Sequence, residues 1–180
     1  MSMRIETERL VLRQFGVSDV DAIYAMCRQP EITDQNPNWK MTRDQVKGFL
    51  QYRINQYENI DPCNSCVSLA VTLKDTGELV GYCGVGKHSD LPETEVAYFI
   101  SRPHQNRGYA TEATRAIVAW VLATTALPYV IATALTDNPA SKRTAAKAGF
   151  QHEGTKRLDH CGKDTVFDYY RFYRLPQPHD

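Results

Sequence analysis

The spacing of apolar and polar residues along the chain predicts a mixture of helices and strands. In residues 67–73, apolar side chains alternate with smaller or polar ones, which is the period of a half-buried strand. In residues 46–57 and 111–124 the apolar positions recur every three or four residues, which predicts amphipathic helices. Residues 129–135 are almost continuously apolar and predict a strand that is buried on both sides.

Turn and capping signals place further elements between these segments. Ser18 and Thr42 each stand three residues before an acidic or amide side chain, which is the spacing of a capping box, so each is expected to begin a helix. Pro30 is expected to end the first of these helices, and residues 29–41 are expected to form a loop. Further strands are predicted at residues 10–13, 79–85, 93–101, 151–158 and 166–173.

The last predicted helix has clear signals at both ends. Asn138 is a good N-cap, Pro139 suits the first helical position, and Gly149 suits the left-handed residue that ends a helix. The order along the chain is then strand, two helices, three strands, helix, strand, helix and two strands. This order predicts the α/β class, as a mixed α+β layer fold in a single domain over residues 1–180, with about seven strands and about four helices.

Composition and charge narrow the location and the partners. The 180 residues include 21 basic and 21 acidic side chains, so bulk charge does not favour nucleic-acid binding. No stretch approaches the ~20 apolar residues of a membrane helix, and residues 1–13 carry no apolar signal core, so a cytoplasmic location is expected. The scattered cysteines favour reduced thiols. Cys63 and Cys66 have Cys-x-x-Cys spacing, but no second pair follows, so no metal site is predicted.

The segment Gln-Asn-Arg-Gly-Tyr-Ala at residues 105–110 carries the strongest chemical signal. It lies between a predicted strand and a predicted helix, and a helix start leaves about four backbone N–H groups unpaired and is partly positive. Gly108 lets the backbone approach an anion such as a pyrophosphate, and Arg107 can add charge. The segment lacks the spacing of a Walker A loop or of a dinucleotide fingerprint. An ordinary strand-to-helix turn remains the alternative.

This segment resembles the acyl-CoA-binding signature of the GNAT superfamily, Gln/Arg-x-x-Gly-x-Gly/Ala. Four further motifs resemble the RimJ/RimL-like branch of that superfamily, in the branch's order, and the likeness runs from Thr7 to about Tyr173. It implies a GNAT fold, whose mostly antiparallel central sheet is splayed in the middle. The four motifs are Glu-Thr-Glu-Arg-Leu-Val-Leu-Arg at residues 6–13, Glu-Val-Ala-Tyr-Phe-Ile at 95–100, Gly-Tyr-Ala-Thr-Glu-Ala at 108–113, and Asn-Pro-Ala-Ser-Lys-Arg at 138–143, followed by Ala-Gly-Phe at 148–150.

The resemblance implies a binding site for acetyl-CoA. The pantetheine arm would pair with backbone groups of the strand before the signature, at Tyr98, Phe99 and Ile100. Asn138 would hydrogen-bond the same arm, although helix capping alone also explains this residue. The pyrophosphate would lie on the signature, whose expected cofactor-binding residues are Gln105, Asn106, Arg107, Gly108, Tyr109, Ala110 and Thr111.

The resemblance also implies direct attack of a primary amine on the thioester. An alkyl ammonium has a pKa of about 10.4 and must first lose a proton, which a carboxylate can accept. Glu95 lies where many family members carry this base, although a lone Glu is more often an exposed surface charge. Ser141 is the candidate general acid, although it also suits the first turn of its helix. Ala145 stands where many members have a tyrosine acid, so that acid is missing.

Three functions stay open at this point. The first is acetyl transfer to a protein N-terminus or a small amine, and the second is an acyl-CoA-binding module without turnover. The third is an RNA-associated protein, since the branch often modifies ribosomal proteins, but the balanced charge disfavours direct nucleic-acid binding. The sequence does not determine the amine acceptor. The aromatic last strand could also serve a homodimer.

The sequence also suggests positions for three aromatic residues and for the histidines. Trp39, Tyr52 and Tyr57 are candidates for the acceptor site, with core packing as the alternative for the tyrosines. The histidines show no ligand spacing, so His88 and the others are expected at the surface.

Overall fold

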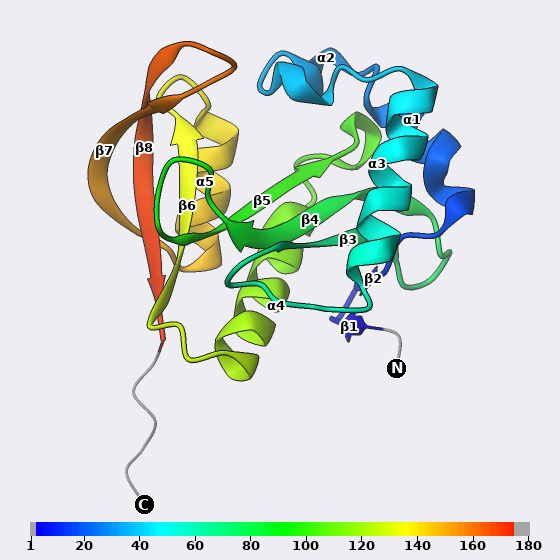
Figure 1. The fold of residues 1–180 in the computed structure, drawn as a ribbon, viewed down its shortest axis with the longest axis horizontal. Coiled ribbons are helices and arrows are strands. Elements are labelled where there is room, and N and C mark those ends of the chain that lie inside the picture. Colours follow the sequence, from blue (N-terminus) through cyan, green and yellow to red (C-terminus); the bar gives the residue numbers. More distant parts are fainter. Residues whose placement is uncertain (1–2, 175–180) are drawn as a thin grey trace, which may run out of the picture.

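A mixed sheet of eight strands forms the middle layer of the molecule (Figure 1). The structure is a computed structural model and describes residues 3–174. The strands lie in the order β1-β2-β3-β4-β5-β6-β8-β7, and each neighbouring pair is antiparallel except β5 and β6. Their bounds are β1 Arg4–Glu6, β2 Leu10–Arg13, β3 Cys66–Leu73, β4 Leu79–Lys87, β5 Thr94–Ile100, β6 Tyr129–Leu135, β7 Gln151–Asp159 and β8 Asp164–Tyr173.

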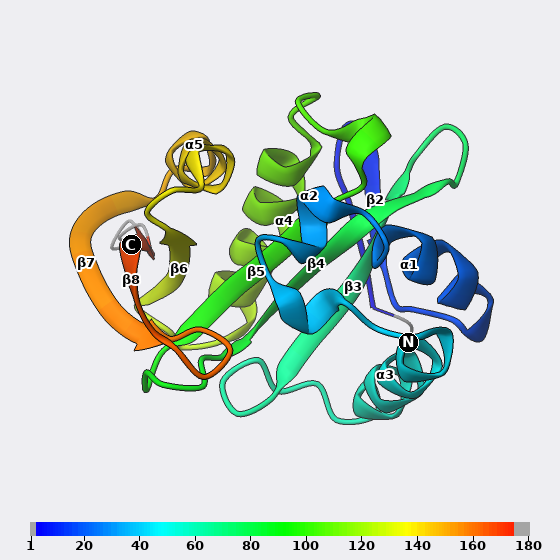
Figure 2. The same cartoon turned by 90° about the horizontal axis from the view of Figure 1, so that it is seen from above.

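Helices cover both faces of the sheet (Figure 2). On one face lie α1 (Val20–Met26), α2 (Pro30–Thr33) and α3 (Arg43–Gln56); on the other lie α4 (Tyr109–Thr124) and α5 (Pro139–Ala148). The core is therefore divided into two clusters, one on each side of the sheet. Within residues 3–174, no helix combines the length and the apolar character needed to cross a membrane. Single 3-10 turns occur at η1 Val17–Asp19, η2 Pro37–Trp39 and η3 Arg102–His104.

Strands β5 and β6 separate in the middle of the sheet. They run parallel, and only Glu95 and Ile131 face each other in register. Beyond that pair, residues 98–100 are paired with β4 on one side only. We call this gap between β5 and β6 the split. The mostly antiparallel sheet with a central splay, expected from the resemblance, is confirmed.

The number of elements is larger than expected. The described residues form eight strands and five α-helices, against about seven and about four predicted. Strand β1 was missed because its three residues include a single apolar side chain, Ile5, so the sequence shows no alternation there. Helix α2 lies inside the predicted loop of residues 29–41. Pro30 occupies its first turn, a position where proline favours a helix as well as ending the one before it.

Two local predictions were wrong. The first helical segment is capped at Gly16 rather than Ser18, because the Gly16 N–H donates to the Asp19 carboxylate at 2.8 Å and a 3-10 turn precedes α1. Strand β3 is buried along both faces rather than half-buried, because helices pack on each side of it. The small and polar residues between its larger apolar side chains face the second core cluster, where Ala70 contributes.

The remaining caps are confirmed. The Thr42 hydroxyl accepts from the Gln45 N–H at 3.3 Å, and the Gln45 side chain accepts from the Thr42 N–H at 2.7 Å. The Asn138 carbonyl oxygen accepts from the N–H of Ser141 at 3.0 Å. Gly149 ends α5 with a left-handed φ of 105°. These signals depend only on a few consecutive residues, so they could be recognised in the sequence.

Asp19→Ala is expected to destabilise the fold. Asp19 is 5% exposed, and its carboxylate accepts two hydrogen bonds from Arg13, at 2.7 and 2.9 Å, besides the one from Gly16. Removing this shared acceptor leaves partly buried donors unpaired, so we expect the free energy of unfolding to fall by about 1–3 kcal/mol, as measured by urea denaturation. Asp21→Ala is the control, because Asp21 forms one exposed ion pair with Arg43. Equal losses in the two variants would contradict this account.

Candidate active site

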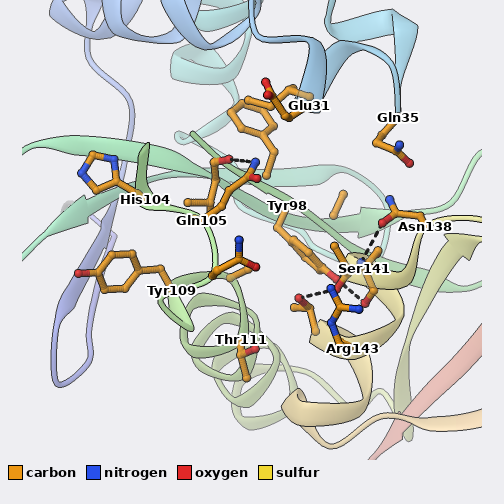
Figure 3. Close-up of a pocket in the computed structure, with 18 of the residues that line it drawn as sticks. Glu31, Gln35, Tyr98, His104, Gln105, Tyr109, Thr111, Asn138, Ser141 and Arg143 are labelled. Atoms are coloured by element: carbon orange, nitrogen blue, oxygen red, sulfur yellow. Dashed lines mark hydrogen bonds between the residues drawn. The ribbon is translucent and has the colours of Figure 1, made fainter. Parts of the chain in front are cut away.

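A cavity of about 580 Å³ opens where β5 and β6 separate (Figure 3). Strand β5, the loop after it, the start of α4 and one side of α5 form its walls, while α2 and η2 contribute residues from the opposite side. Glu95 and Arg107 are not among the lining residues. The other predicted site residues line it: Tyr98, Phe99, Ile100, Gln105, Asn106, Gly108, Tyr109, Ala110, Thr111, Asn138 and Ser141.

The loop before α4 presents backbone N–H groups to this cavity. Asn106 and Gly108 have left-handed conformations, with φ of 60° and 83°. Left-handed residues that alternate with ordinary ones turn successive N–H groups toward one point, an anion-binding arrangement called a nest. Among the described residues we find no acceptor for the N–H groups of residues 106–111. This nest, residues 106–111, therefore fits an anion such as a pyrophosphate.

Two cationic side chains line the same cavity from α5. Arg143 and Lys147 are exposed, lie one helical turn apart, and form no ion pair with an acidic side chain of the described chain. Figure 3 shows Arg143 beside Ser141. Neither residue was predicted from the sequence as part of the site. Their four-residue spacing on a predicted helix could have indicated that the two cations lie on the same helix face.

Side-chain hydrogen bonds connect strand β5 to the first turn of α5 and to the loop before α4. The Tyr98 hydroxyl donates to the Ser141 carbonyl at 3.2 Å and lies 3.2 Å from Ser141 Oγ. Burial raises the pKa of Tyr98 to about 12, so this hydroxyl keeps its proton at neutral pH. The Gln105 amide donates to the Ile100 carbonyl at 2.9 Å and ties the loop to the end of β5. The capping role predicted for Asn138 is confirmed, and its pantetheine role stays a prediction.

Glu95 lies at the base of the split, where β5 and β6 are still in register. Its carboxylate accepts from the Thr133 hydroxyl at 2.5 Å and from the Thr133 N–H at 3.1 Å. It therefore provides a hydrogen-bond acceptor for a backbone N–H of the neighbouring strand, β6. Its side chain is only 22% exposed, so it is not the free surface charge that was the alternative. Burial raises the pKa of Glu95, although nearby His88 and the Thr133 hydrogen bonds act in the opposite direction. A carboxylate with a raised pKa is a stronger base.

The side chain of His88 is largely shielded from solvent beside Glu95, and its expected surface position was wrong. Its side chain is 9% exposed, and its Nδ1 accepts from the N–H groups of Asp90 and Leu91 at 2.9 and 3.2 Å. In the neutral ring the proton therefore sits on Nε2, which lies 3.8 Å from a Glu95 carboxylate oxygen. No sequence pattern indicates this contact, because it depends on how the loop after β4 folds back.

The aromatic residues considered for the acceptor site separate into two groups. Trp39 lines the cavity and packs edge-on against Phe99, with ring centroids 4.7 Å apart. Tyr52 is 57% exposed on α3, and Tyr57 is held by backbone hydrogen bonds, so neither lines the cavity. Glu31 also lines the cavity (Figure 3), and it was not predicted because it lies in none of the sequence motifs.

Comparison with known proteins identifies the family. A family model described as an acetyltransferase (GNAT) domain matches residues 9–151. The uncharacterized N-acetyltransferase YoaA of Bacillus subtilis (strain 168) is 30% identical, over 91% of this chain and 92% of its own length. A Bacillus anthracis acetyltransferase (GNAT family) is 24% identical with a TM-score of 0.81, covering 95% of this chain and 98% of that one.

A further solved structure is RimL, described as a ribosomal L7/L12 alpha-N-protein acetyltransferase in complex with coenzyme A. It is 15% identical with a TM-score of 0.78, and covers 95% of this chain and 98% of its own. The fold is thus shared widely, and the family model covers most of the sequence. The chain belongs to the GNAT acetyltransferase family and is an N-acetyltransferase of the RimJ/RimL type.

Proposed function

We propose that this enzyme transfers the acetyl group of acetyl-CoA to the primary amine of a protein N-terminus or a small molecule, with Glu95 as general base. The observation that carries the proposal is the nest of residues 106–111, whose N–H groups have no acceptor among the described residues and which, apart from Arg107, lines the cavity beside the split. Acetyl-CoA supplies the activated thioester that the amine attacks. The complex of RimL with coenzyme A supports this choice of donor.

Several features of the cavity fit such a donor. The nest suits the pyrophosphate, and the cations Arg143 and Lys147 add attraction for phosphate groups. The one-sided pairing of residues 98–100 leaves strand backbone for the amide groups of the pantetheine arm. The side-chain oxygen of Asn138 caps α5, and its nitrogen is available as a donor to the same arm.

Glu95 is placed to accept the proton of the attacking amine. Ala97 and Phe99 follow it on the same face of β5 and line the cavity, and Ala97 is exposed, so an acceptor lying over Ala97 would approach the carboxylate. The two bonds from Thr133 hold that carboxylate in one orientation. Its raised pKa matches it better to an amine proton than an ordinary carboxylate, which titrates at about 4.3.

We assign the return of a proton to the leaving thiolate to Ser141. Ser141 lines the cavity, and its hydroxyl lies 3.2 Å from the Tyr98 hydroxyl, which can hold it in place; after the step, Ser141 would regain a proton from solvent. A thiol has a pKa of about 8.5, so this step needs only modest assistance. A single domain over residues 1–180, a cytoplasmic location, a homodimer and the lack of direct nucleic-acid binding stay predictions.

Calorimetric titration with acetyl-CoA, followed by a thiol-release assay against a panel of peptides and small amines, tests the proposal. We expect binding and amine-dependent release of free thiol. Binding without release on any amine would support an acyl-CoA-sensing module instead, and no binding would reject the donor site.

Glu95→Gln is expected to lower kcat with amine acceptors by about 10²–10⁴-fold, because the amide cannot accept the proton. The dissociation constant for acetyl-CoA should stay unchanged, because Glu95 does not line the cavity. Steady-state kinetics and calorimetry measure the two quantities. Glu58→Gln is the control, since Glu58 is exposed just after α3. Unchanged turnover in Glu95→Gln would reject Glu95 as the base.

The pH dependence of kcat gives an independent test of the same residue. Protonated Glu95 cannot act as a base, so kcat should fall as the pH decreases through its raised pKa. The Thr133 hydrogen bond favours the ionised form, so Thr133→Val should move this acidic limb to higher pH. A limb that stays in place, or moves to lower pH, would show that another group controls the rate.

A further inference from the structure

The segment that leads into β2 is fastened to the start of α4. Glu112, in the first turn of α4, accepts from the Thr7 hydroxyl at 2.6 Å and from the backbone N–H of Arg9 at 2.9 Å. The Arg9 guanidinium completes the contact, with its Nε at 2.8 Å and an Nη at 2.7 Å from the other carboxylate oxygen. One carboxylate therefore binds three groups that lie more than a hundred positions away in the sequence.

The same guanidinium also holds the loop that forms the nest. Its second Nη donates to the Arg107 carbonyl at 3.0 Å, and its plane lies over the ring of Tyr109, 4.9 Å from the centroid. A Cβ added at Gly108 would meet this guanidinium at 3.3 Å, so the packing against the loop is close. Arg9 thus contacts Arg107 and Tyr109 and lies close to Gly108 between them, and it is not among the residues that line the cavity.

This contact controls the direction of one N–H group in the nest. In a planar trans peptide, the C=O and the following N–H point in opposite directions. Since Arg9 holds the carbonyl of Arg107, the N–H of Gly108 is directed the opposite way, and Gly108 lines the cavity. Without this bond the peptide could rotate, because Gly108 tolerates many backbone conformations.

Both ends of the contact are themselves fixed. The Arg9 carbonyl accepts from the Lys74 N–H at 2.9 Å, and the next residue, Leu10, is fully buried in the core. Burial alone would raise the pKa of Glu112, but the hydrogen bonds from Thr7 and Arg9 outweigh it and lower the pKa, so the carboxylate remains charged at neutral pH. The contact can therefore resist displacement of the loop.

We propose that Thr7, Arg9 and Glu112 form a clamp that holds the nest in the orientation required by a pyrophosphate-bearing ligand. Arg9 is a positioning residue in this proposal: it does not line the cavity and acts through the Arg107 carbonyl. The inference depends on the proposed donor site, and deepens it by naming the residues outside the cavity that shape it.

Arg9→Lys tests the clamp. Lysine keeps the positive charge but lacks the planar guanidinium group that binds the Glu112 carboxylate and the Arg107 carbonyl together. We expect the dissociation constant for coenzyme A, measured by calorimetry, to rise about tenfold. KM for acetyl-CoA should rise similarly while kcat changes little. With S-acetylpantetheine, which has the thioester but no pyrophosphate, kcat/KM should not change.

The matched control is Arg157→Lys, which alters a comparable arginine–carboxylate pair with Asp164 in the β7–β8 hairpin, away from the cavity. It should leave both donors unaffected. Unchanged coenzyme A affinity in Arg9→Lys, or an equal loss of kcat/KM with both donors, would overturn the clamp while leaving the donor site in place. If the wild-type protein bound no coenzyme A, the donor site and the clamp would both be rejected.

Discussion

The site depends on the separation of two parallel strands at the centre of the sheet. Strands β5 and β6 are in register only at Glu95 and Ile131, and beyond that pair each loses a neighbour. Unpaired backbone groups inside a protein are costly, so their partners must come from elsewhere. Side chains supply some of them: Glu95 binds the Thr133 N–H at the base, and Gln105 binds the Ile100 carbonyl at the open end. The groups that remain are available to a ligand.

The two ends of the split have different electrostatic character. At the open end the free N–H groups of residues 106–111 and the side chains of Arg143 and Lys147 favour an anion. At the base lies the partly buried carboxylate of Glu95, next to His88. Burial raises the pKa of this carboxylate, which suits a group that accepts a proton. In the proposed reaction, this arrangement would separate the binding of phosphate groups at the open end from proton transfer at Glu95 at the base.

The opposite wall of the cavity is held by contacts that cross between distant segments. Gln29 accepts from the Arg102 N–H at 2.8 Å, and Glu31 forms an ion pair with the Arg102 side chain, so α2 is tied to the turn that precedes the nest. Arg9 and Glu112 fix the far side of the same loop. The loop that the donor would occupy is thus supported from two sides by parts of the chain that bind no donor themselves.

Sequence alone determined whatever depends on neighbouring residues. The caps at Thr42 and Asn138, strand β6 and the left-handed Gly149 that ends α5 were predicted, because periodicity, capping and the left-handed preference of glycine are local properties. The family motifs placed most of the cavity lining. Tertiary structure alone decided the rest. It brought His88 to Glu95 and placed Arg9 behind the nest. Such contacts arise when loops and strands far apart in the chain pack together, and no short-range pattern encodes that packing.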